Sequence, residues 1–110
     1  MIRPAGLYGA SKVWGESLAR YFFDNYGLSI ICVRIGFVSE SDRPSATRHS
    51  AVYLSHRDLC QALTLAIQAP SEMGFEVFFA VSNNKWGYRD LQHSKQLLGY
   101  EPLDSSDVFI

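Results

Sequence analysis

Long apolar runs and an excess of charge of one sign are both missing from this 110-residue sequence. No apolar run approaches the ~20 residues that a helix needs to cross a bilayer, and the first four residues contain no signal-peptide core. Ten basic and eleven acidic residues are scattered along the chain, which leaves a formal net charge of -1. We therefore expect a cytoplasmic protein, with no membrane or nucleic acid among its partners.

Cysteine is scarce, with two residues in the whole chain. Cys32 lies in an apolar run and Cys60 in a helical pattern, and neither belongs to a Cys-x-x-Cys motif or a Cys/His cluster. The three histidines have no metal-ligand spacing with one another or with the cysteines. We therefore expect two buried, reduced thiols and no metal site.

A glycine-rich turn is missing as well. Neither Gly-x-Gly-x-x-Gly nor Gly-x-x-Gly-x-x-Gly, the turns that hold a dinucleotide pyrophosphate between a strand and a helix, occurs in the chain. The first helical pattern begins almost at once, with no strand before it. We therefore expect residues 1–110 to form a single partial domain in which the nucleotide-binding half of the fold is absent.

Apolar periodicity and turn residues predict alternating helices and strands. The predicted elements are a helix over 8–26, a strand over 28–35, a polar loop over 36–50, a short extended piece over 51–54, a helix to about residue 68, a strand over 75–81, a helix over about 88–98 and an irregular tail. The apolar run of the first strand is typical of a strand buried on both faces. This order predicts an α/β fold, the C-terminal part of a Rossmann-like parallel sheet with flanking helices.

Two local signals mark the helix that follows the loop. Ser55 and Asp58 have the spacing of a capping box, with Asp in place of the commoner Glu or Gln. Leu59, Leu63, Ala66 and Ile67 have the spacing of a buried face, and Pro70 ends the pattern. His56 is interpreted as part of this helix start, and Trp86 as a packing or surface aromatic residue.

Tyr8 and Lys12 are four residues apart, which places their side chains about one turn apart on one face of the first helix. A nearby ammonium group stabilises the phenolate form of a tyrosine and so favours its use in acid–base chemistry. The same spacing also occurs in ordinary surface helices, where both side chains extend into solvent. The spacing alone leaves both interpretations open.

The residues around this pair resemble the active-site helix of the extended short-chain dehydrogenases, which typically reads Pro-x-x-x-Tyr-x-x-Ser-Lys followed by a small residue and Glu. The corresponding residues here are Pro4, Tyr8, Ser11, Lys12, Gly15 and Glu16. The resemblance continues in the family's order through the segments 33–36, 53–58, 78–82 and 98–109. Within the family, the sequence is most similar to the uronate dehydrogenases and their nucleotide-sugar epimerase relatives.

The resemblance implies an oxidoreductase that uses NAD or NADP and acts on a sugar. Tyr8 would take the proton from the anomeric hydroxyl group as a hydride leaves for the nicotinamide, and Lys12 would bind the ribose hydroxyl groups of the cofactor. Gly36, Phe37 and Val38, just after the strand, would line the nicotinamide pocket. Alternatively, Gly36 merely permits a tight exit from the strand.

Arg48 matches the position of an arginine that binds the substrate carboxylate in the uronate dehydrogenases. A guanidinium group pairs bidentately with a carboxylate, so a sugar acid is a suitable ligand. Arg43, in the same loop, is a competitor, and either arginine could be a solvated loop charge. Phe37 departs from the family, in which a serine commonly follows this glycine, so a hydroxyl donor is missing there.

The resemblance therefore implies oxidation of a hexuronate to its lactone. The alternatives are an NAD-dependent nucleotide-sugar epimerase or dehydratase, and a truncated, non-catalytic remnant or docking module. Because the family's upstream Ser or Thr is absent along with the nucleotide-binding half, we expect the chain alone to be inactive. Tyr21, Phe22 and Phe23 provide apolar area for a homo-oligomer through the first helix, or else belong to the core.

Overall fold

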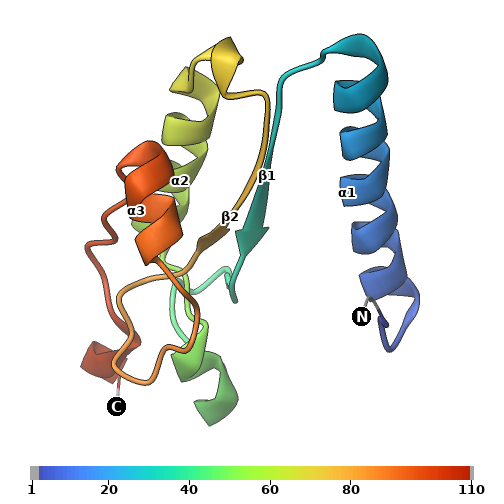
Figure 1. Ribbon diagram of the computed structural model, residues 1–110. Helices are drawn as coiled ribbons and strands as arrows, with labels where there is room; N and C mark the ends of the chain where they lie inside the picture. Colours follow the sequence, from blue (N-terminus) through green and yellow to red (C-terminus); the bar gives the residue numbers. More distant parts are fainter. Residues whose placement is uncertain (1–2, 110) are drawn as a thin grey trace. The chain divides into compact units, whose positions relative to one another are not determined.

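The computed structural model describes residues 3–109, which form two compact units. The first unit comprises residues 3–32 and 70–76, and the second comprises residues 33–69 and 77–109. The helices and strands in chain order are α1 (Leu7–Tyr26), β1 (Ile30–Ile35), α2 (His56–Gln68), β2 (Phe75–Ala80) and α3 (Gln92–Leu98) (Figure 1). Three short 3-10 helices are η1 (Thr47–Ala51), η2 (Ser71–Met73) and η3 (Ser106–Phe109).

Helix α1 confirms the first predicted helix and begins one residue before the predicted start. Gly27, in the left-handed conformation with φ 67°, ends the helix, and its N–H donates to the carbonyl oxygen of Phe23. The Phe23 ring packs near Phe75, with 6.3 Å between the ring centroids. At Gly74, whose φ is 74°, a Cβ atom would lie 2.9 Å from the Phe23 ring, so glycine is required there.

Strands β1 and β2 form a two-stranded parallel sheet, which confirms both predicted strands and the α/β class. The N–H of Ile30 donates to the Gly74 carbonyl oxygen at 2.9 Å. The N–H of Gly36 donates to the Ala80 carbonyl oxygen at 3.1 Å, so the pairing advances in the same direction along both strands. Burial of β1 on both faces, however, is wrong: its residues are half-buried or exposed. A continuous apolar run specifies a strand without specifying how many layers cover it.

Helix α2 has the predicted start and end. The Ser55 Oγ accepts a hydrogen bond from the Asp58 N–H at 3.0 Å, as an N-cap does. The predicted apolar face is partly wrong, since Ile67 is 83% exposed and Leu63 is 44% exposed. The fully buried residues of α2 are instead Asp58 and Ala62. Leu59 and Ala66, the other two residues of the predicted face, are half-buried, so the buried stripe is offset from the predicted one and overlaps it in part.

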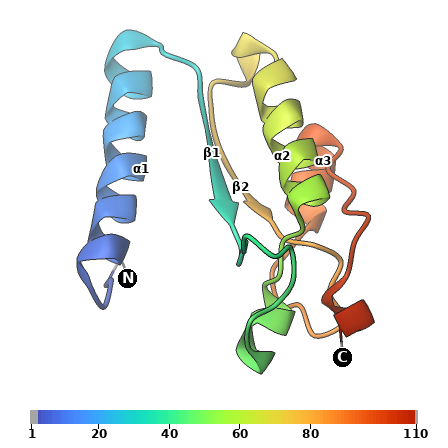
Figure 2. The ribbon, with the colours of Figure 1, turned by 180° about the vertical axis from the view of Figure 1, so that it is seen from behind.

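Helix α3 is shorter than predicted and starts at Gln92 instead of about Tyr88. The Asp90 Oδ1 accepts a hydrogen bond from the Gln92 N–H at 2.9 Å, which forms a turn in place of the first helical turn. Gly99, with φ 75°, ends α3 at the predicted position. In the second unit α2 and α3 flank β2 (Figures 1 and 2).

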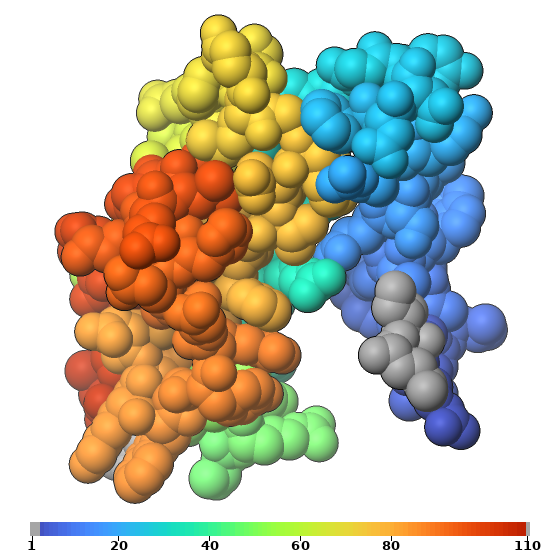
Figure 3. All heavy atoms as spheres, viewed as in Figure 1, coloured from blue at the N-terminus to red at the C-terminus, as the bar shows by residue number. Residues whose placement is uncertain are grey.

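The core of the second unit lies between β2 and these helices. Its buried apolar residues are Tyr53, Leu54, Ala62, Phe78, Ala80, Val81 and Tyr100. Figure 3 shows the orange atoms of α3 directly against the yellow-orange atoms of β2. The Tyr100 hydroxyl group donates to the Val81 carbonyl oxygen at 2.8 Å. Burial, followed by the charges of Asp58 and Asp104, raises the pKa of Tyr100 above the ordinary value, so the phenol stays protonated.

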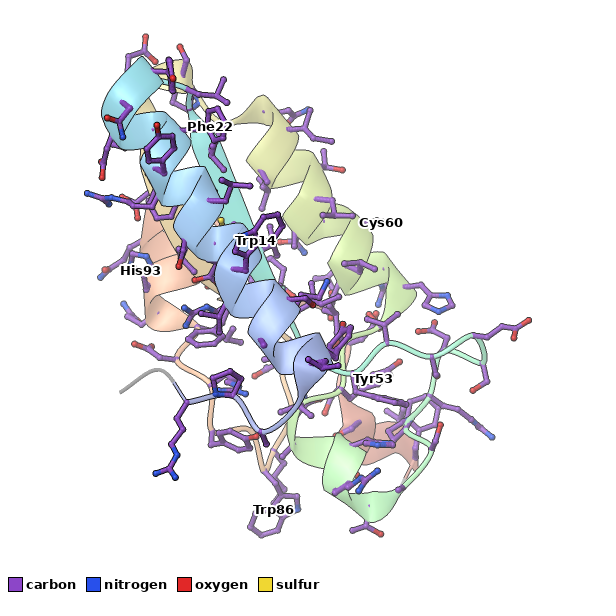
Figure 4. All side chains as sticks on the ribbon, turned by 90° about the vertical axis from the view of Figure 1, so that its right-hand side faces the viewer. Trp14, Phe22, Tyr53, Cys60, Trp86 and His93 are labelled. Atoms are coloured by element: carbon purple, nitrogen blue, oxygen red, sulfur yellow. The ribbon has the colours of Figure 1, made fainter. Side chains whose placement is uncertain are left out.

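Neither cysteine forms a disulfide in the part of the chain that the structure describes, but their burial differs from the prediction. Cys32 is half-buried, whereas Cys60 is exposed on α2, so the predicted burial of Cys60 is wrong (Figure 4). Within residues 3–109, no helix has both the length and the apolar character that a membrane crossing requires.

Candidate active site

The predicted catalytic pair lies at the start of α1, in the first unit. The Lys12 Nζ atom lies over the Tyr8 ring, 5.2 Å from its centroid. Tyr8 is 77% exposed, so its hydroxyl group is accessible to a ligand. Ser11 is turned back to its own helix, since its Oγ donates to the Tyr8 carbonyl oxygen at 2.6 Å. The structure thus brings Tyr8 and Lys12 together on one helix face.

The predicted nicotinamide-lining residues follow β1 in the second unit. At Gly36, a Cβ atom would lie 2.0 Å from the Val52 carbonyl oxygen and 2.7 Å from a Val81 methyl carbon, so a side chain does not fit there. The Phe37 N–H donates to the Val52 carbonyl oxygen at 2.7 Å, and the Phe37 carbonyl oxygen accepts from Leu54 N–H at 2.9 Å. Because these backbone groups are already paired, a ligand here would meet the Phe37 ring and the half-buried Val38.

Arg48 lines a pocket of about 590 Å³ in the second unit. The lining residues are Pro44, Ser45, Ala46, Thr47, Arg48, Ser50, Ala51, Trp86 and Phe109. Trp86 is 65% exposed and projects from the turn after β2 (Figure 4). The pocket thus combines one guanidinium group, several hydroxyl groups and two aromatic rings, a mixture that suits a polar ligand with an apolar face.

Arg43, the competitor of Arg48, has a different environment. Its guanidinium carbon lies over the Phe109 ring, 5.1 Å from the centroid, and its N–H and carbonyl groups are both bonded to Ser39 Oγ. Arg43 therefore packs on a wall residue of the pocket, whereas Arg48 is itself a lining residue. The sequence pattern did not identify Phe109 as part of a site, because its contribution depends on the return of the tail to the loop.

The loop before η1 is held by Tyr53 and Asp42. The Tyr53 hydroxyl group donates to the Asp42 carbonyl oxygen at 2.8 Å and to Asp42 Oδ1 at 3.2 Å. Asp42 has φ 58°, and its Oδ1 also accepts from the His56 N–H at 2.8 Å. Burial, followed by the negative charge of Asp42, raises the pKa of Tyr53 to about 12. His56 is the first residue of α2, as predicted, and its Nε2 contacts the Ser39 carbonyl oxygen at 2.6 Å.

A buried carboxylate holds the tail of the chain against the second unit. Asp58 is fully buried and accepts hydrogen bonds from Ser82 Oγ at 2.6 Å, Leu103 N–H at 2.7 Å and Asp104 N–H at 3.0 Å. Farther along, Ser106 Oγ donates to the Ser50 carbonyl oxygen at 2.7 Å. The capping-box interpretation assigned Asp58 to the helix start alone and missed this role.

Asp104 is the second acid of this cluster. It accepts from Arg57 Nη2 at 2.6 Å and from Ser55 Oγ at 2.6 Å. These two hydrogen bonds, led by the one from Arg57, hold the pKa of Asp104 below its usual value. A carboxylate with a depressed pKa stabilises the folded state above its unfolded pKa, and this contribution disappears as the pH falls through the folded pKa.

We therefore predict that Asp104→Asn reduces the pH dependence of stability on the acid side. In the parent chain, the free energy of unfolding should fall as the pH drops below about 4, the usual value for an aspartate. The variant should be less stable near neutral pH and should lose less stability on acidification. Urea unfolding at a series of pH values measures both slopes, and parallel slopes would contradict the assignment.

The parallel β1–α2–β2 arrangement corresponds to a segment of a Rossmann-like α/β fold, and the comparisons with known proteins agree. No family model matches the chain. The NAD-dependent glucose-6-phosphate dehydrogenase of Haloferax volcanii is 35% identical over 108 residues, which are 97% of this chain and 40% of that protein. The uronate dehydrogenase of Pseudomonas syringae pv. tomato is 38% identical over 107 residues, 97% of this chain and 38% of that protein.

The crystal structure of uronate dehydrogenase from Agrobacterium tumefaciens matches with a TM-score of 0.86 and 36% identity, over 97% of this chain and 39% of that one. A mutant of that enzyme has been solved in complex with NAD. This chain is thus a homologue of uronate dehydrogenase and related NAD-dependent sugar dehydrogenases, and the resemblance seen in the sequence is confirmed. It spans about 40% of the length of these relatives.

Proposed function

We propose that this chain is part of an NAD-dependent oxidoreductase that converts a hexuronate to its lactone. The observation that carries the proposal is the contact of Lys12 with Tyr8 on an exposed helix face, in a chain homologous to uronate dehydrogenases over 97% of its length. A tyrosine beside an ammonium group is suited to proton transfer with a hydroxyl group.

The residues present fit one part of NAD. The Lys12 ammonium group supplies hydrogen-bond donors for ribose hydroxyl groups, and the exposed Tyr8 hydroxyl group is accessible to a reacting sugar. The chain has no glycine-rich turn for the pyrophosphate, so these residues do not account for that part. When bound, NAD supplies the hydride acceptor for C1 of the sugar.

The chain's own contribution is to position groups and to move a proton. Tyr8 accepts the proton from the anomeric hydroxyl oxygen, so that this oxygen becomes the lactone carbonyl oxygen as the hydride leaves C1 for the nicotinamide. The Lys12 ammonium group lies over the Tyr8 ring, 5.2 Å from its centroid, and so places a positive charge beside this proton transfer. Arg48 pairs with the C6 carboxylate of the hexuronate and so selects a sugar acid over a neutral sugar.

A chimera tests the reaction without depending on the 110-residue chain alone. Residues 3–109 would replace the matched segment of the Agrobacterium tumefaciens enzyme, whose fold they share with a TM-score of 0.86. We expect the chimera to produce NADH from glucuronate or galacturonate. Turnover of a nucleotide-sugar without NADH production would favour an epimerase. A folded chimera that binds NAD but has no activity on either substrate would favour a non-catalytic segment.

Substrate recognition is tested by Arg48→Gln, with Arg43→Gln as the matched control. Loss of a charged hydrogen-bonded pair costs about 1.5–3 kcal/mol, so Arg48→Gln should raise KM for glucuronate roughly 10- to 100-fold. The KM for glucose, which has no carboxylate, should stay within about twofold. Arg43→Gln should affect both sugars alike. An equal effect of Arg48→Gln on glucuronate and glucose would show that Arg48 does not bind the carboxylate.

A further inference from the structure

The Arg48 pocket is built from three segments that lie far apart in the sequence. The loop and turn that lead into and form η1 supply residues 44–48, 50 and 51 of its wall, Trp86 belongs to the turn after β2, and Phe109 ends η3. A binding site keeps a defined geometry only when its supporting segments are held in place. The contacts between the three segments therefore decide how the Arg48 guanidinium group lies relative to the two aromatic rings.

Ser106 belongs to one of these segments and is bonded to the other two. Its Oγ donates to the Ser50 carbonyl oxygen of η1 at 2.7 Å. Its N–H donates to Asn84 Oδ1 at 3.0 Å, two residues before Trp86. Ser106 is also the first residue of η3, which ends at Phe109. The residue is fully buried, so both hydrogen bonds are shielded from water. One buried serine thus joins all three walls of the pocket.

The hydroxyl group of Ser106 makes the contact that nothing else duplicates. The tail is bonded to the turn after β2 by two further backbone donors, Asn83 N–H to the Asp104 carbonyl oxygen at 2.8 Å and Lys85 N–H to Asp107 Oδ1 at 3.3 Å. Between η3 and η1, by contrast, the Ser106 hydroxyl group supplies the only hydrogen bond within residues 3–109. Its removal therefore weakens the attachment of η1, which carries Arg48, to the other two walls.

We propose that Ser106 is a positioning residue for Arg48, whose hydroxyl group holds η1 so that the guanidinium group shares one pocket with Trp86 and Phe109. The inference rests on the proposed function, in which Arg48 pairs with the carboxylate of a hexuronate. A guanidinium group that pairs bidentately needs a fixed direction as well as a charge. Ser106 is buried and does not line the pocket, so it acts through the backbone of η1 and not on the ligand itself.

The kinetic signature of such a residue is a change in KM without a change in kcat. Loss of a hydrogen bond of this kind shifts an equilibrium roughly 3- to 10-fold, so Ser106→Ala in the chimera should raise KM for glucuronate by this factor. The kcat value should stay within about twofold, because the lost binding is equal in the ground state and the transition state. A merely structural role has the opposite signature, since a smaller folded fraction lowers kcat and leaves KM unchanged.

Ser105→Ala is the matched control, because it removes the same group one residue away. The Ser105 Oγ accepts a hydrogen bond from the Asp107 N–H at 3.1 Å, so this hydroxyl group is bonded within the tail. KM and kcat should both equal the parent values. Ser106→Cys provides a second variant if Ser106→Ala does not fold, because it fills the same buried space with a much weaker donor. It should raise KM for glucuronate in the same direction.

A double variant shows whether Ser106 acts through Arg48. Because Arg48→Gln already removes the carboxylate contact, Ser106→Ala should add little to its effect on KM for glucuronate. The attachment of η3 is followed separately by NMR of the 110-residue chain. The Tyr53 and Phe109 rings have centroids 5.6 Å apart, so nuclear Overhauser contacts between them should weaken in Ser106→Ala and persist in Ser105→Ala.

The proposal is overturned if Ser106→Ala leaves KM for glucuronate unchanged, if it lowers kcat in place of raising KM, or if Ser105→Ala has the same effect. Additive effects of Ser106→Ala and Arg48→Gln would also contradict it. If Arg48→Gln leaves KM for glucuronate unchanged while Ser106→Ala weakens the contacts between the two rings, the assignment of Arg48 to the carboxylate fails and the attachment of η1 by Ser106 stands.

Discussion

Replacement of Tyr8 by Phe should abolish NADH production by the chimera while leaving its fold and its affinity for NAD nearly unchanged. The substitution removes one hydroxyl group from a side chain that is 77% exposed, so it creates no cavity. A positioned acid–base group contributes roughly 10²–10⁴-fold to a reaction rate. We therefore expect kcat to fall by at least about 100-fold, with KM for glucuronate within about threefold of the parent value.

The matched control for this prediction is Tyr26→Phe. Tyr26 lies on the same helix and is 70% exposed, but it packs in an aromatic cluster with Phe22 and has no lysine one turn away. Its loss of a hydroxyl group should leave kcat unchanged. Steady-state kinetics and calorimetric titration with NAD provide the comparison. A Tyr8→Phe chimera that retains more than a tenth of the parent kcat would exclude Tyr8 as the proton acceptor.

Lys12 gives an independent check on the same chemistry. Lys12→Met removes the positive charge that lies over the Tyr8 ring as well as the proposed donors for ribose. Both kcat and the affinity for NAD should decrease, whereas Tyr8→Phe decreases kcat alone. This difference separates a role in cofactor binding from a role in proton transfer.

The elements that the sequence predicted well are those whose signals are local. Gly27 and Gly99 each end a helix by adopting the left-handed backbone conformation. Ser55 starts α2 because its side chain accepts a hydrogen bond from the first turn. Each signal acts within one helical turn, so it needs no knowledge of the rest of the fold. The Tyr8–Lys12 contact was predictable for the same reason, because helical geometry alone places residues four apart on one face.

The features that the sequence missed depend on segments far apart in the chain. Phe109 became a pocket residue because Ser106 and Asp104 are bonded to residues 56 and 46 positions earlier. The two hydrogen bonds of Ser106 depend on a tail that returns to η1 and to the turn after β2 at the same time. Ile67 had the spacing of a core residue, yet spacing does not say which side of a helix the sheet covers.

Loss of the Asp58 carboxylate should destabilise the second unit more than any other single polar truncation that we describe. Asp58 is fully buried, and its two oxygens accept from Ser82 Oγ, Leu103 N–H and Asp104 N–H. Asp58→Ala leaves these three donors without the carboxylate and away from bulk water. An unsatisfied buried polar group costs about 1–3 kcal/mol, so a total loss of about 3 kcal/mol is expected even if water re-enters the site.

The effect should be largest in the tail, and this separates the hydrogen-bond network from simple loss of volume. Asp58→Asn has nearly the same volume but replaces one acceptor oxygen by an NH2 group, so it should lose about half as much stability as Asp58→Ala. Glu40→Ala, at an exposed acid in the same unit, should change the free energy of unfolding by less than about 0.5 kcal/mol. Urea unfolding measures the free energy of unfolding of all three variants.

Hydrogen exchange locates the effect within the unit. In Asp58→Ala, the exchange rates of the Leu103 and Asp104 amides should increase more than those of other amides, because these two N–H groups lose their acceptor directly. An Asp58→Ala variant as stable as Glu40→Ala would show that the tail is held without this carboxylate.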